Sequence, residues 1–311
     1  MRQQLMPDVL ILNDEDTPWC QNIHDWLPPH YRCVITLQTD SVDLSNVSIL
    51  LGAPPDLALV IGKCPRIKWV QSTWAGIDSI SHFASDSLII TAMKGVFGQS
   101  MSEYIFGWLL ALERGLLDHA NATAWHPITG HSTRGKTLGI MGTGSIGSTL
   151  PIIAKQFGMT CHGLNTDGHA VAGFDRMFAS ADRLAFADGL DYLVNVLPKT
   201  PATDNIISEA LLAKVNADAI LINVGRGNAV DDAALLNALS NGTLRYAVLD
   251  VFDQEPLPAG HPFWQQSNVF VTSHTAAETP SDAIVDLFQK NFGCFIQGKP
   301  LQHAVLPQRG Y

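Results

Sequence analysis

A glycine-rich turn directly behind a buried strand is the feature that most limits what this chain can fold into. The apolar run 137–141 leads into Gly142-Thr143-Gly144-Ser145-Ile146-Gly147, and a helical pattern follows. In such a turn the first glycine permits a tight bend, the second lets backbone approach a pyrophosphate, and the third lets the helix pack on the strand. N–H groups at the start of the helix then face the phosphates. The segment predicts a dinucleotide site, although similar turns also occur in proteins that bind no dinucleotide.

The composition is that of a globular protein with more than one domain. The chain has 311 residues, of which 46% are hydrophobic and 15% charged, so a large core and two domains are expected. Its formal charge of -10 argues against general binding to nucleic acid or to an anionic membrane. The sequence shows neither a secretory signal nor an apolar run of about 18 residues, and we therefore expect a cytoplasmic protein.

The five cysteines predict neither disulfides nor a metal centre. They are scattered along the chain, and no two of them form a C-x-x-C pair. We interpret them as small apolar core residues in a reducing compartment. They are Cys20, Cys33, Cys64, Cys161 and Cys294.

Short apolar runs alternate with helical or polar stretches, which is typical of parallel sheets covered by helices and predicts an α/β fold. In the first part of the chain we expect strands at 9–12, 34–37, 49–51, 68–71 and 88–91. In the second part we expect a six-stranded, doubly wound dinucleotide domain with strands at 138–141, 160–164, 192–196, 219–224, 246–251 and 269–272.

Three helical features accompany these strands. Residues 100–117 carry apolar side chains at helical spacing and predict one long helix between the two sets of strands. Residues 280–298 form a last amphipathic helix, which we expect to pack on the N-terminal domain. Pro151 falls inside the helix expected after Gly147, and it predicts a kink or a late start, because an interior proline removes a hydrogen bond.

Three polar side chains follow successive strands of the second set. Arg226 lies between two glycines after the strand at 219–224, Glu255 lies in the next such loop, and His274 follows the last strand. Because the carboxyl ends of parallel strands share one edge of a sheet, we expect the three to meet there. An arginine can clamp a carboxylate, a histidine can donate a proton to a carbonyl oxygen, and a glutamate can keep that donor protonated. Each also has a structural interpretation, as a solvated arginine, a solvated glutamate or a hydrogen-bonded histidine.

These motifs together resemble the D-isomer-specific 2-hydroxyacid dehydrogenases, and glyoxylate/hydroxypyruvate reductases in particular, over nearly the whole chain. The matching segments are 142–147, Leu197-Pro198-Lys199-Thr200, 222–227, 249–252, 255–258 and 274–277. In the first domain, 69–72 with 75–78 resembles the family's substrate loop.

The resemblance implies an oxidoreductase that transfers a hydride between NAD(P)H and a small 2-oxoacid such as glyoxylate or hydroxypyruvate. His274 would be the acid and base, Glu255 would hydrogen-bond it, and Arg226 would bind the substrate carboxylate. The substrate would also contact Trp74, Ala75 and Gly76, with Trp74 either forming a wall or simply packing. The cofactor positions would be Gly142, Gly144, Ser145, Ile146, Gly147, Asn165, Leu197, Pro198, Val224, Gly225 and Asp250.

The resemblance also implies a domain arrangement. A Rossmann coenzyme domain, 94–275, would be inserted in a discontinuous, flavodoxin-like substrate domain formed by 1–93 and 276–311, with the active site in the cleft. Family members are usually dimers through their coenzyme domains, so a homodimer that uses the helix at 100–117 is expected.

Two departures from the family pattern affect the prediction. Ser273 replaces the usual proline before the histidine, which should alter loop stiffness more than chemistry. Asn165 stands where NAD-preferring members have aspartate, and a neutral residue removes the repulsion against a 2′-phosphate. No arginine follows it directly, and Asp167 either opposes that phosphate or is a turn residue. The cofactor is therefore NADP or NAD, with a slight preference for NADP.

A hypothesis of another class is an NAD(H)-sensing scaffold of the family's corepressor type, since that branch can retain the same three residues. Formate-oxidising members have glutamine where this chain has Glu255, which disfavours that branch. The motifs do not exclude oxidation of phosphite. Turnover of a small oxoacid would separate the reductase from the scaffold.

Overall fold

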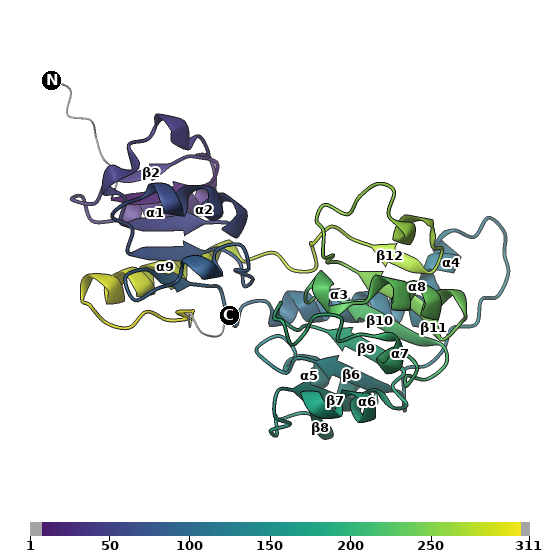
Figure 1. Cartoon of the computed structure of the whole chain (residues 1–311). Helices are drawn as coiled ribbons and strands as arrows, with labels where there is room; N and C mark the ends of the chain where they lie inside the picture. The colour runs from purple at the N-terminus through teal and green to yellow at the C-terminus, as the bar shows by residue number, and fades with distance from the viewer. Residues whose placement is uncertain (1–7, 306–311) are drawn as a thin grey trace. The chain divides into compact units, whose positions relative to one another are not determined.

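The computed structural model describes residues 8–305, which form two compact units (Figure 1). The first unit contains the chain up to Val96 and again from Thr279, and the second contains Phe97–Glu278. Each boundary lies three residues further along the chain than the predicted positions after 93 and after 275.

The first unit contains a five-stranded sheet in the order β2-β1-β3-β4-β5, in which every pair is parallel. This strand order is flavodoxin-like, as expected. The strands are β1 (Val9–Leu12), β2 (Cys33–Ile35), β3 (Ile49–Gly52), β4 (Trp69–Ser72) and β5 (Ile89–Thr91), which confirms the five predicted strands within two residues. The unit also contains α1 (Pro18–Trp26) and α2 (Pro54–Val60).

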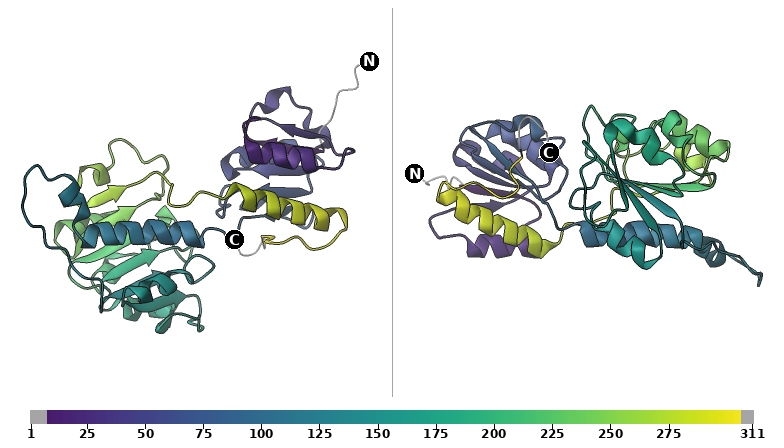
Figure 2. Two further views of the ribbon diagram at one scale, coloured as in Figure 1. Left: turned by 180° about the vertical axis from the view of Figure 1, so that it is seen from behind. Right: turned by 90° about the horizontal axis from the view of Figure 1, so that it is seen from below.

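The last helix, α9 (Ser281–Ile296), packs on this first unit, as predicted. Phe288 stacks on Trp69 of β4 with ring centroids 5.2 Å apart, and Phe292 meets the edge of Trp26 of α1 at 5.5 Å. Figure 2 shows α9, in yellow, beside α1, in purple. The apolar side of the amphipathic pattern therefore covers the sheet.

The second unit contains a seven-stranded parallel sheet in the order β12-β11-β10-β9-β6-β7-β8. Counted within the unit, the first six strands have the Rossmann order 3-2-1-4-5-6, so both halves of the predicted fold class are confirmed. The strands are β6 (Thr137–Met141), β7 (Thr160–Asn165), β8 (Arg176–Ala179), β9 (Tyr192–Asn195), β10 (Ala219–Asn223), β11 (Leu244–Leu249) and β12 (Val269–Val271).

The predicted count of six strands in this unit is wrong, because β8 was not expected. It is an edge strand of four residues, it begins with a charged side chain, and only Phe178 in it is buried. Such a segment carries too little apolar pattern to indicate a strand.

The helices of the second unit differ from the prediction in one place. The single helix expected at 100–117 is two helices, because Gly115 adopts a left-handed φ of 62° between them. Figure 2 shows the longer of these, α3, in blue along one face of the sheet. The helices are α3 (Gly98–Glu113), α4 (Leu116–Ala120), α5 (Leu150–Gln156), α6 (Arg183–Ala187), α7 (Glu209–Leu212) and α8 (Asp232–Ser240).

Alternate side chains of the central strands enter different cores. Ile140 of β6 packs with Ile105 of α3, whereas Met141, the next residue, belongs to the core that contains Phe186 of α6. Because the sheet is buried on both faces, the ends of its strands are held in fixed positions. The loops that follow therefore begin from fixed points.

Pro151 lies in the first turn of α5, which confirms the predicted late start of this helix. Residues between Gly144 and Leu150 form hydrogen-bonded turns, for example with Ser148 N donating to Gly144 O at 2.9 Å. The proline therefore takes a position where its missing N–H costs no helical hydrogen bond.

All five cysteines are free, and three of them, Cys20, Cys64 and Cys161, are buried. Burial raises the pKa of the Cys20 thiol to about 12, which keeps it protonated and unreactive. Within residues 8–305 no group of three or more His, Cys, Asp and Glu side chains is arranged to hold a metal ion. In the same range no helix has the length and apolar character needed to cross a membrane.

Candidate active site

The glycine-rich turn begins at β6, and the sheet order reverses between β6 and β9. Gly142 has a φ of 96°, and a Cβ on it would lie 3.2 Å from Val196 O. A Cβ on Gly147 would lie 1.9 Å from Gly142 O, whereas a Cβ on Gly144 would meet no heavy atom within 4 Å. Two glycines are therefore needed to form the turn, and Gly144 leaves open space beside backbone. That space fits a bound pyrophosphate.

Two buried asparagines join the ends of β9 and β10. Asn195 Nδ2 donates to Asn223 Oδ1 at 2.8 Å, and that oxygen also accepts from Gly225 N at 3.2 Å. Leu197 N donates to Asn195 Oδ1 at 3.2 Å, and a Cβ on Gly225 would lie 2.7 Å from Leu197 O. The predicted cofactor segments around Leu197 and Gly225 are thus fixed to each other. This pair was not predicted from the sequence. Its sequence signal is an asparagine as the last residue of each of two buried strands.

Arg226 emerges from this fixed segment and is half-buried. Its Nη1 donates to Gly225 O at 2.8 Å, and its own carbonyl accepts from Asn223 Nδ2 at 3.2 Å. A Cβ on the next residue, Gly227, would lie 1.8 Å from the backbone carbon of Phe252. The loop after β10 therefore touches the loop after β11 through backbone, and this contact brings the arginine segment next to the glutamate segment.

Asp250, at the end of β11, holds the loop that follows β12. Its side chain is buried, with 1% of the residue exposed. Oδ1 accepts from Thr272 Oγ1 at 2.6 Å and from Thr275 N at 2.9 Å, and Oδ2 accepts from Ala276 N at 3.0 Å. Its backbone oxygen accepts from His274 N at 2.8 Å. Asp250 is therefore a positioning residue, and its predicted contact with the cofactor stays a prediction.

His274 and Glu255 form the pair that the sequence predicts. His274 Nδ1 lies 2.8 Å from Glu255 Oε2, and Glu255 Oε1 accepts from Phe252 N at 2.9 Å. The two side chains are 40% and 36% exposed, so both reach solvent. His274 has a φ of 57°, a left-handed conformation that non-glycine residues adopt only when their surroundings hold it, and here Asp250 does so.

Asn165, at the end of β7, is tied into the turn that follows it. Its Nδ2 donates to Thr143 Oγ1 at 3.2 Å and to His169 O at 3.0 Å, and its Oδ1 accepts from Gly168 N at 2.6 Å. Asp167 pairs with His169, with Oδ1 2.5 Å from Nδ1. Of the two alternatives for Asp167, the structure therefore shows a turn residue.

The predicted substrate loop lies in the first unit. Trp74 is 42% exposed, its N–H donates to Ser72 Oγ at 2.9 Å, and its carbonyl accepts from Met93 N at 3.1 Å. Among the described residues, no hydrogen bond uses the N–H of Ala75 or of Gly76. The loop is thus held through Trp74, while the next two amides are available to a ligand.

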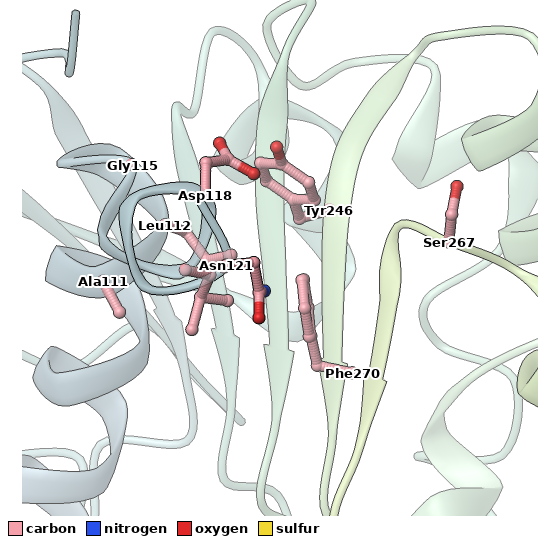
Figure 3. A pocket seen from close by; sticks show the side chains of 9 residues that line it. Ala111, Leu112, Gly115, Asp118, Asn121, Tyr246, Ser267 and Phe270 are labelled. Carbon is pink, nitrogen blue, oxygen red and sulfur yellow. The ribbon is translucent and has the colours of Figure 1, made fainter. Parts of the chain in front are cut away.

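The pocket of about 220 Å³ shown in Figure 3 is not this site. It lies between α3, α4, β11 and β12, near Tyr246 and Ser267 at the amino ends of the two strands. Its lining residues are Ala111, Leu112, Gly115, Leu117, Asp118, Asn121, Tyr246, Ser267 and Phe270. It contains none of the predicted site residues.

A Rossmann unit with a glycine turn at its switch point, and an arginine, a glutamate and a histidine at the carboxyl ends of its strands, defines a dinucleotide-dependent dehydrogenase. The family model for the D-isomer specific 2-hydroxyacid dehydrogenase NAD-binding domain matches residues 106–276. The chain belongs to this family and is an NAD(P)-dependent 2-hydroxyacid dehydrogenase.

Individual relatives agree with this membership. The chain is 32% identical over 257 residues to glyoxylate/hydroxypyruvate reductase A of Serratia proteamaculans, covering 76% of this chain and 82% of the relative. A solved family member from Aeromonas salmonicida superposes with a TM-score of 0.91 at 34% identity, over 97% of this chain and all of the other. An NADPH-dependent glyoxylate/hydroxypyruvate reductase of Sinorhizobium meliloti, solved with NADP and sulfate, gives a TM-score of 0.83 at 28% identity, over 98% of this chain and all of that one.

Proposed function

We propose that the protein reduces a small 2-oxoacid, such as glyoxylate or hydroxypyruvate, to the D-2-hydroxyacid. The observation that carries this proposal is the His274–Glu255 pair, held by Asp250 at the sheet edge that also presents Arg226. The names of the relatives from Serratia proteamaculans and Sinorhizobium meliloti support the substrate class.

The proposed mechanism assigns a proton transfer to His274. Because Nδ1 faces the Glu255 carboxylate and donates to it, Nε2 is the nitrogen that gives its proton to the substrate carbonyl oxygen. The carboxylate then stabilises the histidine through the same hydrogen bond in both protonation states. The reduced nicotinamide, when bound, supplies the hydride.

We infer that Arg226 and the loop that carries Ala75 and Gly76 bind the substrate. The Arg226 guanidinium binds the substrate carboxylate with its planar set of donors and polarises the neighbouring carbonyl. The amides of Ala75 and Gly76, which no described residue uses, bind the other carboxylate oxygen. Trp74 forms a wall of the substrate site.

For the cofactor we infer a preference for NADPH over NADH. Asn165 brings no negative charge to the end of β7, and its side chain is already committed to the turn. The Asp167 carboxylate accepts from His169 N and contacts the His169 ring, so its side chain is held within the turn. The NADP complex of the Sinorhizobium meliloti relative supports this assignment. The amides of Gly144, Ser145, Ile146 and Gly147 would hold the pyrophosphate, and Leu197, Pro198, Val224, Gly225 and Asp250 would surround the nicotinamide.

We further infer a cytoplasmic homodimer that forms through the second unit and uses α3. Two large apolar side chains, Leu116 on α4 and Trp125 on the loop after α4, are exposed at 52% and 103%. We infer that a partner buries them, because removing apolar surface from water stabilises an association.

The decisive experiment follows nicotinamide absorbance with glyoxylate or hydroxypyruvate, with NADPH and NADH assayed in parallel. We expect fast oxidation, faster with NADPH, and a loss of about 10²- to 10⁴-fold in kcat for His274→Ala with unchanged cofactor affinity. His126→Ala, which changes an exposed histidine on the loop after α4, is the matched control.

Near-normal kcat in His274→Ala would contradict the assigned chemistry. Cofactor binding without turnover of any small oxoacid would instead favour the NAD(H)-sensing scaffold. A faster reaction with NADH would overturn the assignment of cofactor preference alone.

A further inference from the structure

A pair of hydroxyl groups connects helix α3 to the loop that carries His274. Tyr104 OH lies 2.6 Å from Thr272 Oγ1, although the two residues are 168 positions apart in the chain. Thr272 Oγ1 in turn lies 2.6 Å from Asp250 Oδ1. Neither Tyr104 nor Thr272 belongs to the site residues predicted from the sequence.

The direction of the hydrogen bonds follows from the chemistry of the groups. An ionised carboxylate only accepts, so Thr272 must donate its single proton to Asp250. Tyr104 must then donate to Thr272, whose proton is already used. Burial raises the pKa of Tyr104 to about 12, so its hydroxyl keeps the proton that this arrangement requires. Each donor in such a row strengthens the next bond.

Asp250 passes this constraint to the catalytic loop. Its carboxylate accepts from Thr275 N and Ala276 N, and its backbone oxygen accepts from His274 N. The Thr272 hydroxyl is the side-chain donor that, with these amides, sets the rotation of the carboxylate. Tyr104 fixes the orientation of the Thr272 hydroxyl, because it donates to a lone pair of the Thr272 oxygen while the Thr272 proton is donated to Asp250.

The helix that carries Tyr104 is a firm support. Ile105 and Leu109, on the same helix, are fully buried against the sheet. Trp108 meets the Tyr104 ring at 6.4 Å and the Phe270 ring of β12 at 5.1 Å. Phe270 and Thr272 lie on the same segment, so α3 contacts it through both an aromatic ring and a hydroxyl.

We propose that Tyr104 is a positioning residue, which orients the Asp250 carboxylate through Thr272 and so holds His274 in its left-handed conformation. The proposal rests on the proposed function only for its effect on turnover. The effect on the loop is a property of the protein without substrate or cofactor.

The first test is hydrogen exchange of the cofactor-free protein, which needs no activity. In Tyr104→Phe, which removes one oxygen and keeps the ring, we expect residues 272–276 to exchange about three- to tenfold faster. Exchange in α3 and in β6 should not change. Thr272→Val should reproduce the effect, and Thr272→Ser should retain wild-type exchange because it keeps the hydroxyl.

Tyr246→Phe is the matched control. Its ring also packs on Phe270, at 5.8 Å, and its hydroxyl makes no hydrogen bond within residues 8–305. Wild-type exchange of 272–276 in Tyr104→Phe would overturn the proposal. Faster exchange throughout α3 would also overturn it, because that would show a general loss of structure.

The second test compares the effect of Tyr104→Phe on kcat with its effect on KM. We expect kcat of Tyr104→Phe to fall about three- to tenfold with unchanged KM and cofactor affinity, since only the placement of His274 changes. A rise in KM at unchanged kcat would overturn the role. If exchange responds as expected while the wild-type protein turns over no oxoacid, the positioning role stands and the proposed function is wrong.

Discussion

At the residue scale, the conformation of His274 is set by a buried carboxylate and not by the residue before it. Most family members have proline at that position, and this chain has Ser273. Asp250 restrains the loop by accepting from Thr272, Thr275 and Ala276 through its side chain and from His274 through its backbone. This restraint does not require a proline before His274.

The surroundings of His162 on β7 predict that the second unit becomes less stable as the pH falls. Burial and, next, Arg176 lower its pKa from the ordinary value of 6.5, and its buried Nδ1 has no hydrogen-bond partner in residues 8–305. Below that ordinary value the unfolded chain binds the proton more readily than the folded one. The stability from the neutral ring is therefore complete above pH 6.5 and is lost as pH falls through the folded pKa.

When the pH is lowered from about 7.5 to about 5.5, we expect the free energy of unfolding to fall less in His162→Gln than in the wild type. Urea unfolding at each pH measures this difference. His126→Gln, which alters an exposed histidine, should lose as much as the wild type. Equal losses in His162→Gln and the wild type would contradict the role of this ring.

At the scale of elements, two glycines of the turn after β6 have different roles: Gly147 is needed for folding, and Gly144 is assigned to cofactor binding. A Cβ on Gly147 would overlap Gly142 O, so we expect Gly147→Ala to lower the free energy of unfolding by about 1–3 kcal/mol. Gly144 faces open space and has no left-handed φ, so Gly144→Ala should change stability by less than about 0.5 kcal/mol. It should nevertheless weaken NADPH binding, because the methyl group takes the space assigned to the pyrophosphate.

Urea unfolding and NADPH titration of both variants check this pair. Undiminished NADPH affinity in Gly144→Ala would show that the pyrophosphate does not lie against this glycine. A fully stable Gly147→Ala would show that the turn can rearrange.

Most elements could be predicted because buried parallel strands leave continuous apolar runs in the sequence. The exceptions have physical reasons. The edge strand β8 buries only Phe178 and so has no such run. The break at Gly115 was hidden, because the apolar spacing of α3 continues into Leu116, and spacing says nothing about φ.

The three polar residues of the candidate site could be placed from the strand-end argument, but their supports could not. Asn195 and Asn223 are 28 residues apart, and Tyr104 and Thr272 are 168 apart. Pairs of this kind depend on which strands become neighbours and on side-chain direction, and neither is encoded in local periodicity.

At the scale of the whole molecule, each unit contains a parallel sheet that is complete in itself, and the site residues predicted from the sequence are divided between the two units. The second unit carries Arg226, Glu255 and His274, and the first carries the amides of Ala75 and Gly76. The proposed proton transfer and cofactor binding involve residues of the second unit, and the proposed amide contacts with the substrate involve residues of the first.

The inferred homodimer belongs to this scale. We expect sedimentation at twice the mass of one chain. Trp125→Ser combined with Leu116→Ser should shift it toward a single chain, because both remove exposed apolar area from the segment that follows α3. Ile152→Ser, which removes an apolar side chain that is 66% exposed on α5, is the control and should sediment like the wild type. Unchanged sedimentation of the double variant would place the interface elsewhere.

The contact between Gly227 and the backbone of Phe252 has a consequence for protein engineering. Two loops that meet without any side chain between them cannot be exchanged singly. A chimera that takes the arginine loop from one relative must take the glutamate loop from the same parent. Recombination libraries that cross over between β10 and β11 should therefore be depleted of active members, whereas crossovers before β10 or after β12 should be tolerated.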